Sequence, residues 1–143
     1  MPRRPRRANT TPPFLVDEEW TSALPFERLP RGIQHFPLEC VVYVPSTHGD
    51  CVLAPHEFEV RRRETTALLV SLFGGCRESM AVGQYRSREG EITAEEVAVL
   101  TGFGDADDYQ RKRHEFLPWL IDKRDEWGQE ALGFEFEGDL WYL

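Results

Sequence analysis

The stretch APHEFEVRRRETTALLVSLFGG, residues 54–75, decides how the rest of this chain is organised. Its apolar side chains recur every three or four residues, the period of one helix face; they are Phe58, Thr65, Leu68, Leu69, Leu72 and Phe73. Pro55 suits the first turn of a helix, and the pair Gly74-Gly75 suits its end. The pattern predicts an amphipathic helix, which needs a sheet or a second helix beneath its buried stripe.

The other side of this helix is predicted to face solvent. It carries the basic run Arg61–Arg63, and Glu57 and Glu59 stand four residues before Arg61 and Arg63. This spacing favours ion pairs that each stabilise a helix by ~0.2–0.5 kcal/mol.

Length and charge limit what the chain can be. Its 143 residues predict one domain with a core that needs neither metal nor disulfide. The net charge is −8, and it is uneven: residues 1–39 hold six basic and five acidic side chains, whereas residues 40–143 hold eleven and twenty. We therefore expect an acidic domain that can meet a basic protein partner, and we do not expect nucleic-acid binding.

The three cysteines, Cys40, Cys51 and Cys76, are an odd number without paired spacing. This is typical of reduced thiols in a cytoplasmic protein. No apolar run approaches the ~18–20 residues that span a bilayer, and the N-terminal arginines precede no apolar segment of a secretory signal. We expect a cytoplasmic protein with no membrane partner and no cofactor.

Two N-terminal segments precede the domain. Residues 1–13, MPRRPRRANTTPP, are predicted to be a disordered Arg/Pro-rich tail, or alternatively a basic arm that touches nucleic acid or an acidic surface. Residues 14–39 combine aromatic side chains with prolines and predict an irregular packing arm, which crosses the domain or a second subunit.

Residues 40–143 predict a ferredoxin-like α+β domain. In chain order the expected elements are a strand at Glu39–Pro45, a loop at Ser46–Asp50, the helix, strands within Glu78–Ser87 and Glu91–Phe103, a helix from Asp105, a strand through Leu132–Phe136 and a last strand at Leu140–Leu143. This order, βαββαβ with a short extra strand at the end, predicts an antiparallel sheet with both helices on one face. A hairpin is expected around Gly90.

The second helix is predicted to break. Asp105 is the expected N-cap, and Pro118 should kink or split the helix. The expected buried stripe is Tyr109, Phe116, Leu117, Leu120, Ile121 and Trp127.

Four stretches carry a resemblance to a known set of proteins: YVPS at Tyr43–Ser46, LFGG at Leu72–Gly75, GQYRSREG at Gly83–Gly90 and EWGQEALGFEFEGDLWYL at Glu126–Leu143. With these stretches, residues 40–143 resemble small uncharacterised bacterial proteins of ferredoxin-like topology. The resemblance implies that topology and no particular chemistry, and it leaves residues 1–39 uncovered.

A polar cleft on the open sheet face is the first candidate site. Tyr43, Tyr85, Arg86 and Glu95 lie in three strands that should be neighbours. A phenol, a guanidinium and a carboxylate together can orient and protonate a small substrate. The alternative is a cross-strand pair of Arg86 and Glu95 on a wet surface.

A second candidate is a ligand-binding group made of Gln84, Trp127, Gln129 and Glu130. The alternative places Trp127 in the core, with Gln129 and Glu130 in solvent. His48, Cys51 and His56 have a spacing that zinc accepts. However, there is no paired Cys or His motif, so no metal site is predicted.

The sequence holds no nucleophile motif and no phosphate-binding loop. We therefore expect a non-enzymatic binding or regulatory module, a homodimer with an acidic surface for a protein partner. The alternative is a small enzyme that acts on a small molecule or nucleotide in the sheet-face cleft.

Overall fold

The computed structural model describes residue 32 and residues 34–143. The chain divides into two compact units, Met1–His35 and Phe36–Leu143, and the second unit is described below. The predicted tail of residues 1–13 lies outside the described residues, and so does most of the predicted packing arm of residues 14–39.

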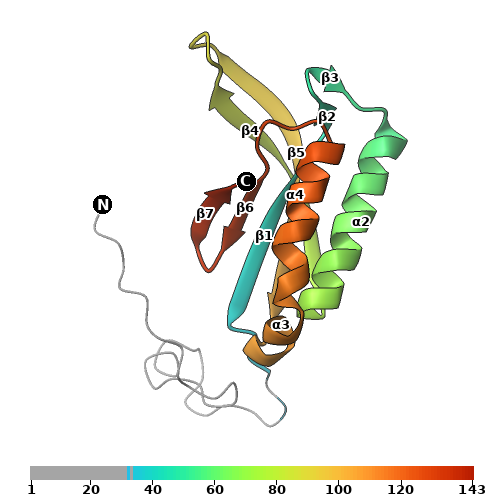
Figure 1. The fold of residues 1–143 in the computed structure, drawn as a ribbon, viewed down its shortest axis with the longest axis vertical. Coiled ribbons are helices and arrows are strands. Elements are labelled where there is room, and N and C mark those ends of the chain that lie inside the picture. The colour runs from blue at the N-terminus through green and yellow to red at the C-terminus, as the bar shows by residue number, and fades with distance from the viewer. Residues whose placement is uncertain (1–31, 33) are drawn as a thin grey trace, which may run out of the picture. The chain divides into compact units, whose positions relative to one another are not determined.

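The second unit consists of strands and helices (Figure 1). In chain order they are β1 (Leu38–Pro45), β2 (Thr47–His48), β3 (Cys51–Val52), α2 (Pro55–Phe73), β4 (Cys76–Arg86), β5 (Ile92–Gly104), α3 (Ala106–Lys112), a 3-10 turn η1 (Arg113–Glu115), α4 (Phe116–Glu126), β6 (Gly133–Phe136) and β7 (Asp139–Tyr142).

The main sheet has the strand order β4-β5-β1-β6-β7, and every neighbouring pair is antiparallel. The antiparallel α+β prediction is therefore confirmed. The element order departs from the prediction at one place, where a small β2–β3 hairpin occupies part of the predicted Ser46–Asp50 loop. The predicted last strand is present as β7, which pairs with β6 at the edge of the sheet.

Helix α2 forms where its sequence pattern predicts it. The Ala54 amide donates to Glu57 Oε2 at 3.2 Å, which satisfies one of the free donors at the helix start. At the other end Gly74 has a φ of 83°, the left-handed conformation that ends many helices. The predicted stripe is buried from Thr65 to Phe73, and Phe58 packs at its margin.

The second helical segment is split, as Pro118 predicts. The Asp105 carboxylate accepts from the Asp108 amide at 2.9 Å and starts α3. The break is η1, which lies just before the first turn of α4. Pro118 stands in that turn and has no N–H to donate to a carbonyl of the preceding turn, so the two helices are not continuous.

The predicted stripe is wrong at Leu117 and Ile121, which are 46% and 39% exposed. Phe116 and Leu120 belong to the same predicted stripe, and these two residues are buried. A residue one position further along lies about 100° around the helix, so Leu117 and Ile121 turn outward.

The core lies between one face of the sheet and both helices. The strands contribute alternate residues, all from one face: Cys40, Val42, Val44, Ala98, Leu100 and Phe134. The helices contribute Leu68, Leu69, Leu72, Phe73, Phe116 and Leu120. The two helices run side by side in Figure 1, and Lys123 Nζ lies 2.8 Å from Glu64 Oε2 between them.

Helix and sheet approach each other closely at Gly102. A Cβ at this position would lie 2.8 Å from Cδ2 of Phe73, so any larger residue forces Phe73 or the backbone to shift. The bare Gly102 backbone thus lets the last turn of α2 rest directly on β5.

None of the helices in the described part of the chain is both long and apolar enough to cross a membrane.

Candidate functional site

The strand register places the four predicted catalytic residues. Directly opposite residues of an antiparallel pair share a face, and Tyr43 lies opposite Val99 while Tyr85 lies opposite Thr93. Glu95, opposite Gly83, shares that open face, away from the helices. Arg86 lies one position beyond Tyr85 and therefore points to the other face. The structure does not bring all four side chains together.

Of the three residues on the open face, Glu95 is engaged in another hydrogen bond, Tyr85 is largely exposed, and Tyr43 lies at a distance from Glu95. Glu95 Oε1 accepts a hydrogen bond of 2.7 Å from the Thr47 hydroxyl. Tyr85 is 54% exposed near the end of the β4–β5 hairpin. Tyr43 is separated from Glu95 by four residues of β5, about 13 Å at the usual rise of a strand.

Tyr43 instead belongs to a cluster that the sequence analysis missed. Its hydroxyl donates to Glu135 Oε1 at 2.8 Å, across 92 residues of sequence. A Cβ built on Gly133 would meet Tyr142 Cε1 at 3.1 Å and Tyr43 Cδ2 at 3.6 Å, so both rings flank this glycine. Tyr43, Glu135 and Tyr142 therefore gather on the open face, and we call them the tyrosine cluster.

Within the tyrosine cluster, the Tyr43 hydroxyl keeps its proton to a higher pH than an ordinary tyrosine does. Burial, followed by the hydrogen bond and the charge of Glu135, raises the pKa of Tyr43 from about 10 to about 12. At neutral pH Tyr43 is a hydrogen-bond donor, Glu135 is an acceptor, and Tyr142 offers a ring that is 70% exposed. Such a group can orient a small aromatic ligand.

One signal in the sequence could have found part of the cluster. Glu135 and Tyr142 alternate with Phe134 and Trp141 along the last two strands, so they share the face opposite the core. The register of β6 against β1, which brings Glu135 next to Val41, depends on contacts far apart in sequence and is not visible in either segment alone.

The predicted ligand-binding residues lie in different places. Trp127 is 3% exposed and belongs to the core. Gln129 Nε2 donates to the carbonyls of Thr47 at 2.8 Å and Trp127 at 3.1 Å. Glu130 is exposed, 4.0 Å from Arg88, and Gln84 is exposed opposite Ala94 on β4.

Arg61 is the largest departure from the predicted solvent-facing basic run. It is 6% exposed, and its guanidinium donates to the carbonyls of Pro45 at 2.9 Å, Thr47 at 2.7 Å and Trp127 at 3.4 Å. Burial lowers the pKa of Arg61, and nearby carboxylates oppose that shift. Together with Gln129, Arg61 ties the end of β1 and the end of α4 to α2, which is a structural role.

The zinc-type spacing does not produce a cluster. Among the described residues, no three His, Cys, Asp or Glu side chains gather closely enough to hold a metal ion. His48 lies over Gly128, where a Cβ would be 2.7 Å from its Nε2, and Cys51 is exposed. Gly128 has a φ of 63°, which also favours glycine there.

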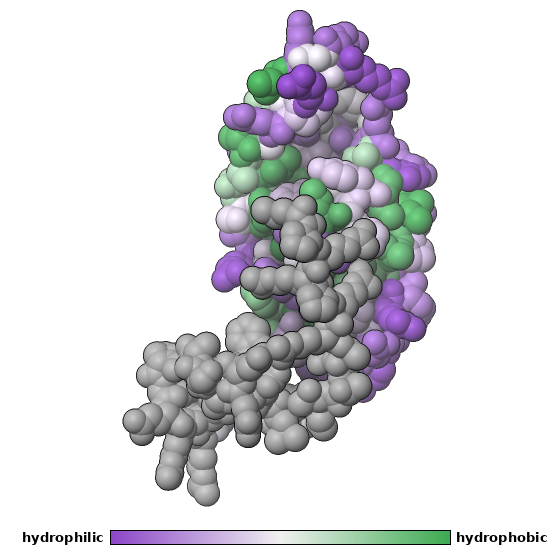
Figure 2. Space-filling model, turned by 90° about the vertical axis from the view of Figure 1, so that its left-hand side faces the viewer, coloured by the Kyte–Doolittle hydropathy of each residue, from purple (hydrophilic) through white to green (hydrophobic). Residues whose placement is uncertain are grey.

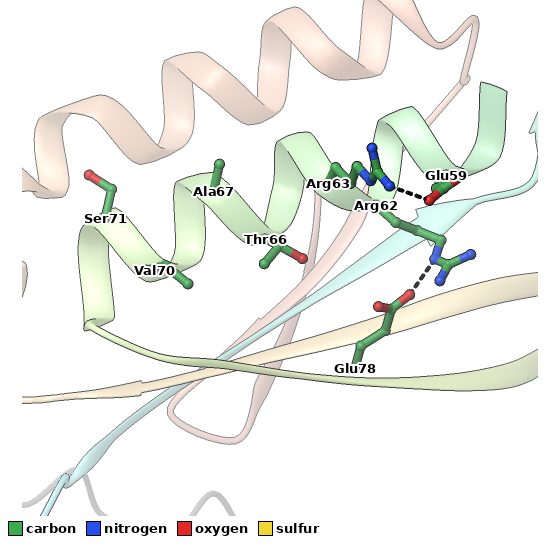
Figure 3. A pocket seen from close by; sticks show the side chains of 8 residues that line it. All are labelled: Glu59, Arg62, Arg63, Thr66, Ala67, Val70, Ser71 and Glu78. Atoms are coloured by element: carbon green, nitrogen blue, oxygen red, sulfur yellow. Dashed lines mark hydrogen bonds and ion pairs between the residues drawn. The ribbon is translucent and has the colours of Figure 1, made fainter. Parts of the chain in front are cut away.

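An open groove of about 710 Å³ runs between α2 and β4 (Figure 3). Its lining residues are Glu59, Arg62, Arg63, Thr66, Ala67, Val70, Ser71 and Glu78. The charges along it are paired, Arg62 with Glu78 and Arg63 with Glu59. The groove therefore offers no free charge to a small anionic ligand.

The end of the β4–β5 hairpin extends beyond the rest of the sheet (Figure 1). β1 stops at Pro45, opposite Val97, so beyond this point the strands β4 and β5 form backbone pairs only with each other. We call residues 82–96 the protruding hairpin. It exposes Val82 (63%), Tyr85 (54%) and Ile92 (75%).

The protruding hairpin is also acidic. It carries the carboxylates Glu89, Glu91, Glu95 and Glu96 against Arg86 and Arg88. Figure 2 shows strongly hydrophilic surface at the upper end of the molecule, where this hairpin ends, with hydrophobic surface beside and below it.

Comparison with known proteins identifies the fold. No family model matches the chain, and no curated protein matches it. A solved structure of a phage SAM lyase in complex with S-methyl-5'-thioadenosine is similar, with a TM-score of 0.55 and 16% identity over 81% of this chain and 95% of the lyase chain. A phage SAM lyase in the apo state has a TM-score of 0.52 and 14% identity over the same shares. At these identities the likeness shows the fold alone.

Proposed function

We propose that this chain is a non-enzymatic binding module, a homodimer that presents an acidic surface to a protein partner. The observation that carries the proposal is the protruding hairpin. Its three exposed apolar side chains, Val82, Tyr85 and Ile92, lie outside the buried core.

The low stability of an isolated hairpin supports the proposal that a partner binds it. Two strands without a third strand or a covering helix are marginally stable in water. Val82 and Ile92 lie on one face of the protruding hairpin and Tyr85 on the other, so neither face is purely polar. A bound protein would cover this apolar surface and stabilise the hairpin.

Charge defines the chemistry of the partner. The excess of carboxylates on the protruding hairpin matches the surplus of twenty acidic over eleven basic side chains in residues 40–143. A partner surface with arginine or lysine around an apolar centre would complement both features.

A peptide titration tests this function. The probe is a fluorescent peptide of alternating Arg and Leu, compared with a Glu and Leu peptide of equal length. We expect saturable binding of the first peptide alone, weaker at about 300 mM than at about 50 mM salt because screening grows. The triple variant Glu89→Gln, Glu91→Gln, Glu96→Gln should bind at least about tenfold more weakly, a loss of about 1.4 kcal/mol.

A control variant removes the same charge elsewhere. Asp107→Asn, Glu115→Gln, Asp122→Asn changes exposed residues of α3, η1 and α4. Its affinity should stay within about threefold of the wild type, because these carboxylates lie outside the proposed surface. Equal losses in both variants would mean diffuse attraction without a site and would reject the hairpin.

A second candidate is a small enzyme that acts on a small molecule or nucleotide on the open sheet face. The tyrosine cluster favours it, and the similar phage SAM lyase was solved with a nucleoside thioether. Saturable binding of S-methyl-5'-thioadenosine that is lost in Glu135→Gln and in Tyr142→Ala would support this candidate. No saturable binding would reject that nucleoside as the ligand.

Two finer assignments belong to the same proposal. The sheet is ferredoxin-like, since β4-β5-β1-β6 follows the split βαβ order, with β7 and the β2–β3 hairpin as additions. The protein works in the cytoplasm, where its free thiols Cys40, Cys51 and Cys76 stay reduced.

A further inference from the structure

The outer edge of β4 is built for strand pairing. β4 ends the sheet, so no strand of the described part of the chain lies along its outer side. Natural edge strands are blunted by prolines, bulges or lysines. β4 has eleven residues without proline or lysine, and its register with β5 runs unbroken from Cys76 to Arg86.

The side chains along this edge are apolar in the middle and charged towards the ends. Met80 is 46% exposed and Val82 is 63% exposed. Glu78 and Arg86 lie on the same face as these two residues, at positions four before and four after Val82. Arg86 has no ion pair among the described residues, whereas Glu78 pairs with Arg62.

We propose that a second copy of the chain pairs with β4 edge to edge, antiparallel about a two-fold axis at Val82. This register sets Val82 against its own copy, Met80 against the partner's Gln84, and Glu78 against the partner's Arg86. Opposite side chains of an antiparallel pair share a face, so the apolar residues and the opposite charges meet. The inference names the interface of the homodimer in the proposed function and rests on that part of it.

The groove beside α2 fits this occupant. It opens between α2 and β4 on the face that carries Met80 and Val82, and Val70 is 45% exposed on its wall. Figure 3 shows Thr66 and Val70 on the side of α2 that looks toward β4. A paired strand brings the partner's side chains to the mouth of this groove and continues the sheet beneath it.

The interface leaves the other side of the protruding hairpin open. Ile92, Glu91 and Glu96 belong to the β5 side, which does not take part in the β4 edge. The homodimer can therefore still present its carboxylates to a basic partner.

Sedimentation velocity and light scattering test the interface. We expect a concentration-dependent species of twice the 16.6 kDa chain mass. Val82→Lys places a charge at the two-fold axis and should weaken the dimer at least about tenfold, since edge lysines block strand pairing. Ile92→Lys, at an exposed β-branched residue of β5, should leave the dimer unchanged.

A charge swap tests the register. Arg86→Glu sets two carboxylates against each other and should weaken the dimer, and the double variant Glu78→Arg, Arg86→Glu should restore it. The double variant also replaces the Arg62–Glu78 pair with two like charges, so Glu78→Arg alone is measured as the control for that repulsion. Thermal unfolding of each variant checks that the monomer is intact.

Two results would overturn the inference. A wild-type chain that stays monomeric at every concentration would reject self-association, although basic-peptide binding could still hold. A dimer that survives Val82→Lys, or one that the charge swap fails to restore, would place the interface elsewhere.

Discussion

The guanidinium of Arg61 lies 5.2 Å from the centroid of the Trp127 ring, although the two residues are 66 positions apart in the chain. The contact closes one end of the core. The Arg61 side chain extends from α2 to Trp127, the residue that ends α4. Its guanidinium donates hydrogen bonds to the Trp127 carbonyl and to the Pro45 carbonyl at the end of β1.

Replacement of Arg61 by Leu should destabilise the protein by about 2–4 kcal/mol, because buried carbonyl groups lose their donors. Gln129 still donates to two of the three carbonyls, which limits the loss. Urea unfolding measures it. Arg63→Leu is the control: its side chain is 78% exposed, and it should change stability by less than about 0.5 kcal/mol. Similar values for both variants would contradict the structural role of Arg61.

The contact of Gly102 with Phe73 makes a second prediction. Gly102→Ala forces the Phe73 ring or the backbone to shift and should cost about 1–3 kcal/mol. Gly83→Ala in the neighbouring strand meets nothing closer than the Glu95 carbonyl at 3.7 Å, so it should be neutral or stabilising by up to ~1 kcal/mol. Thermal unfolding of the pair distinguishes a close helix–sheet approach from a general effect of strand glycines.

The raised pKa of Tyr43 predicts a pH dependence of stability. The unfolded phenol ionises near pH 10, whereas the folded one stays protonated up to about pH 12. The unfolded state therefore binds fewer protons in this window, and stability falls as the pH rises from 10 to 12. Below pH 10 the contribution of Tyr43 is fully present.

Tyr43→Phe should make the loss of stability between pH 10 and 12 shallower, measured by urea unfolding at several pH values. Glu135→Gln should lower the pKa of Tyr43, because it removes the carboxylate that accepts the hydrogen bond of the phenol and repels the phenolate. Absorbance titration of the phenols, with Tyr43→Phe as the blank, follows this shift. A titration of Tyr43 that Glu135→Gln leaves unchanged would contradict the hydrogen bond.

Local patterns in the sequence predict much of this fold. The stripe from Thr65 to Phe73 repeats at helical spacing within one segment, and α2 follows it. Ala98 and Leu100 alternate with more exposed residues within one strand, and both are fully buried on the helix side. Such periods depend only on neighbours in the chain, so they can be read without the tertiary structure.

The candidate sites depend on partners that are distant in sequence. Arg61 has the composition and spacing of an exposed basic run, and only the carbonyls of Pro45, Thr47 and Trp127 make its burial favourable. The grouping of Tyr43 with Glu135 likewise follows from the register of β6 on β1. No pattern within either segment contains that register.

A heteronuclear NMR titration with the Arg and Leu peptide tests, residue by residue, whether the protruding hairpin is the surface that binds a basic protein. We expect the largest amide shifts within residues 82–96, on the β5 side. Shifts concentrated instead around Gly133 and Tyr142, on the tyrosine cluster, would contradict it.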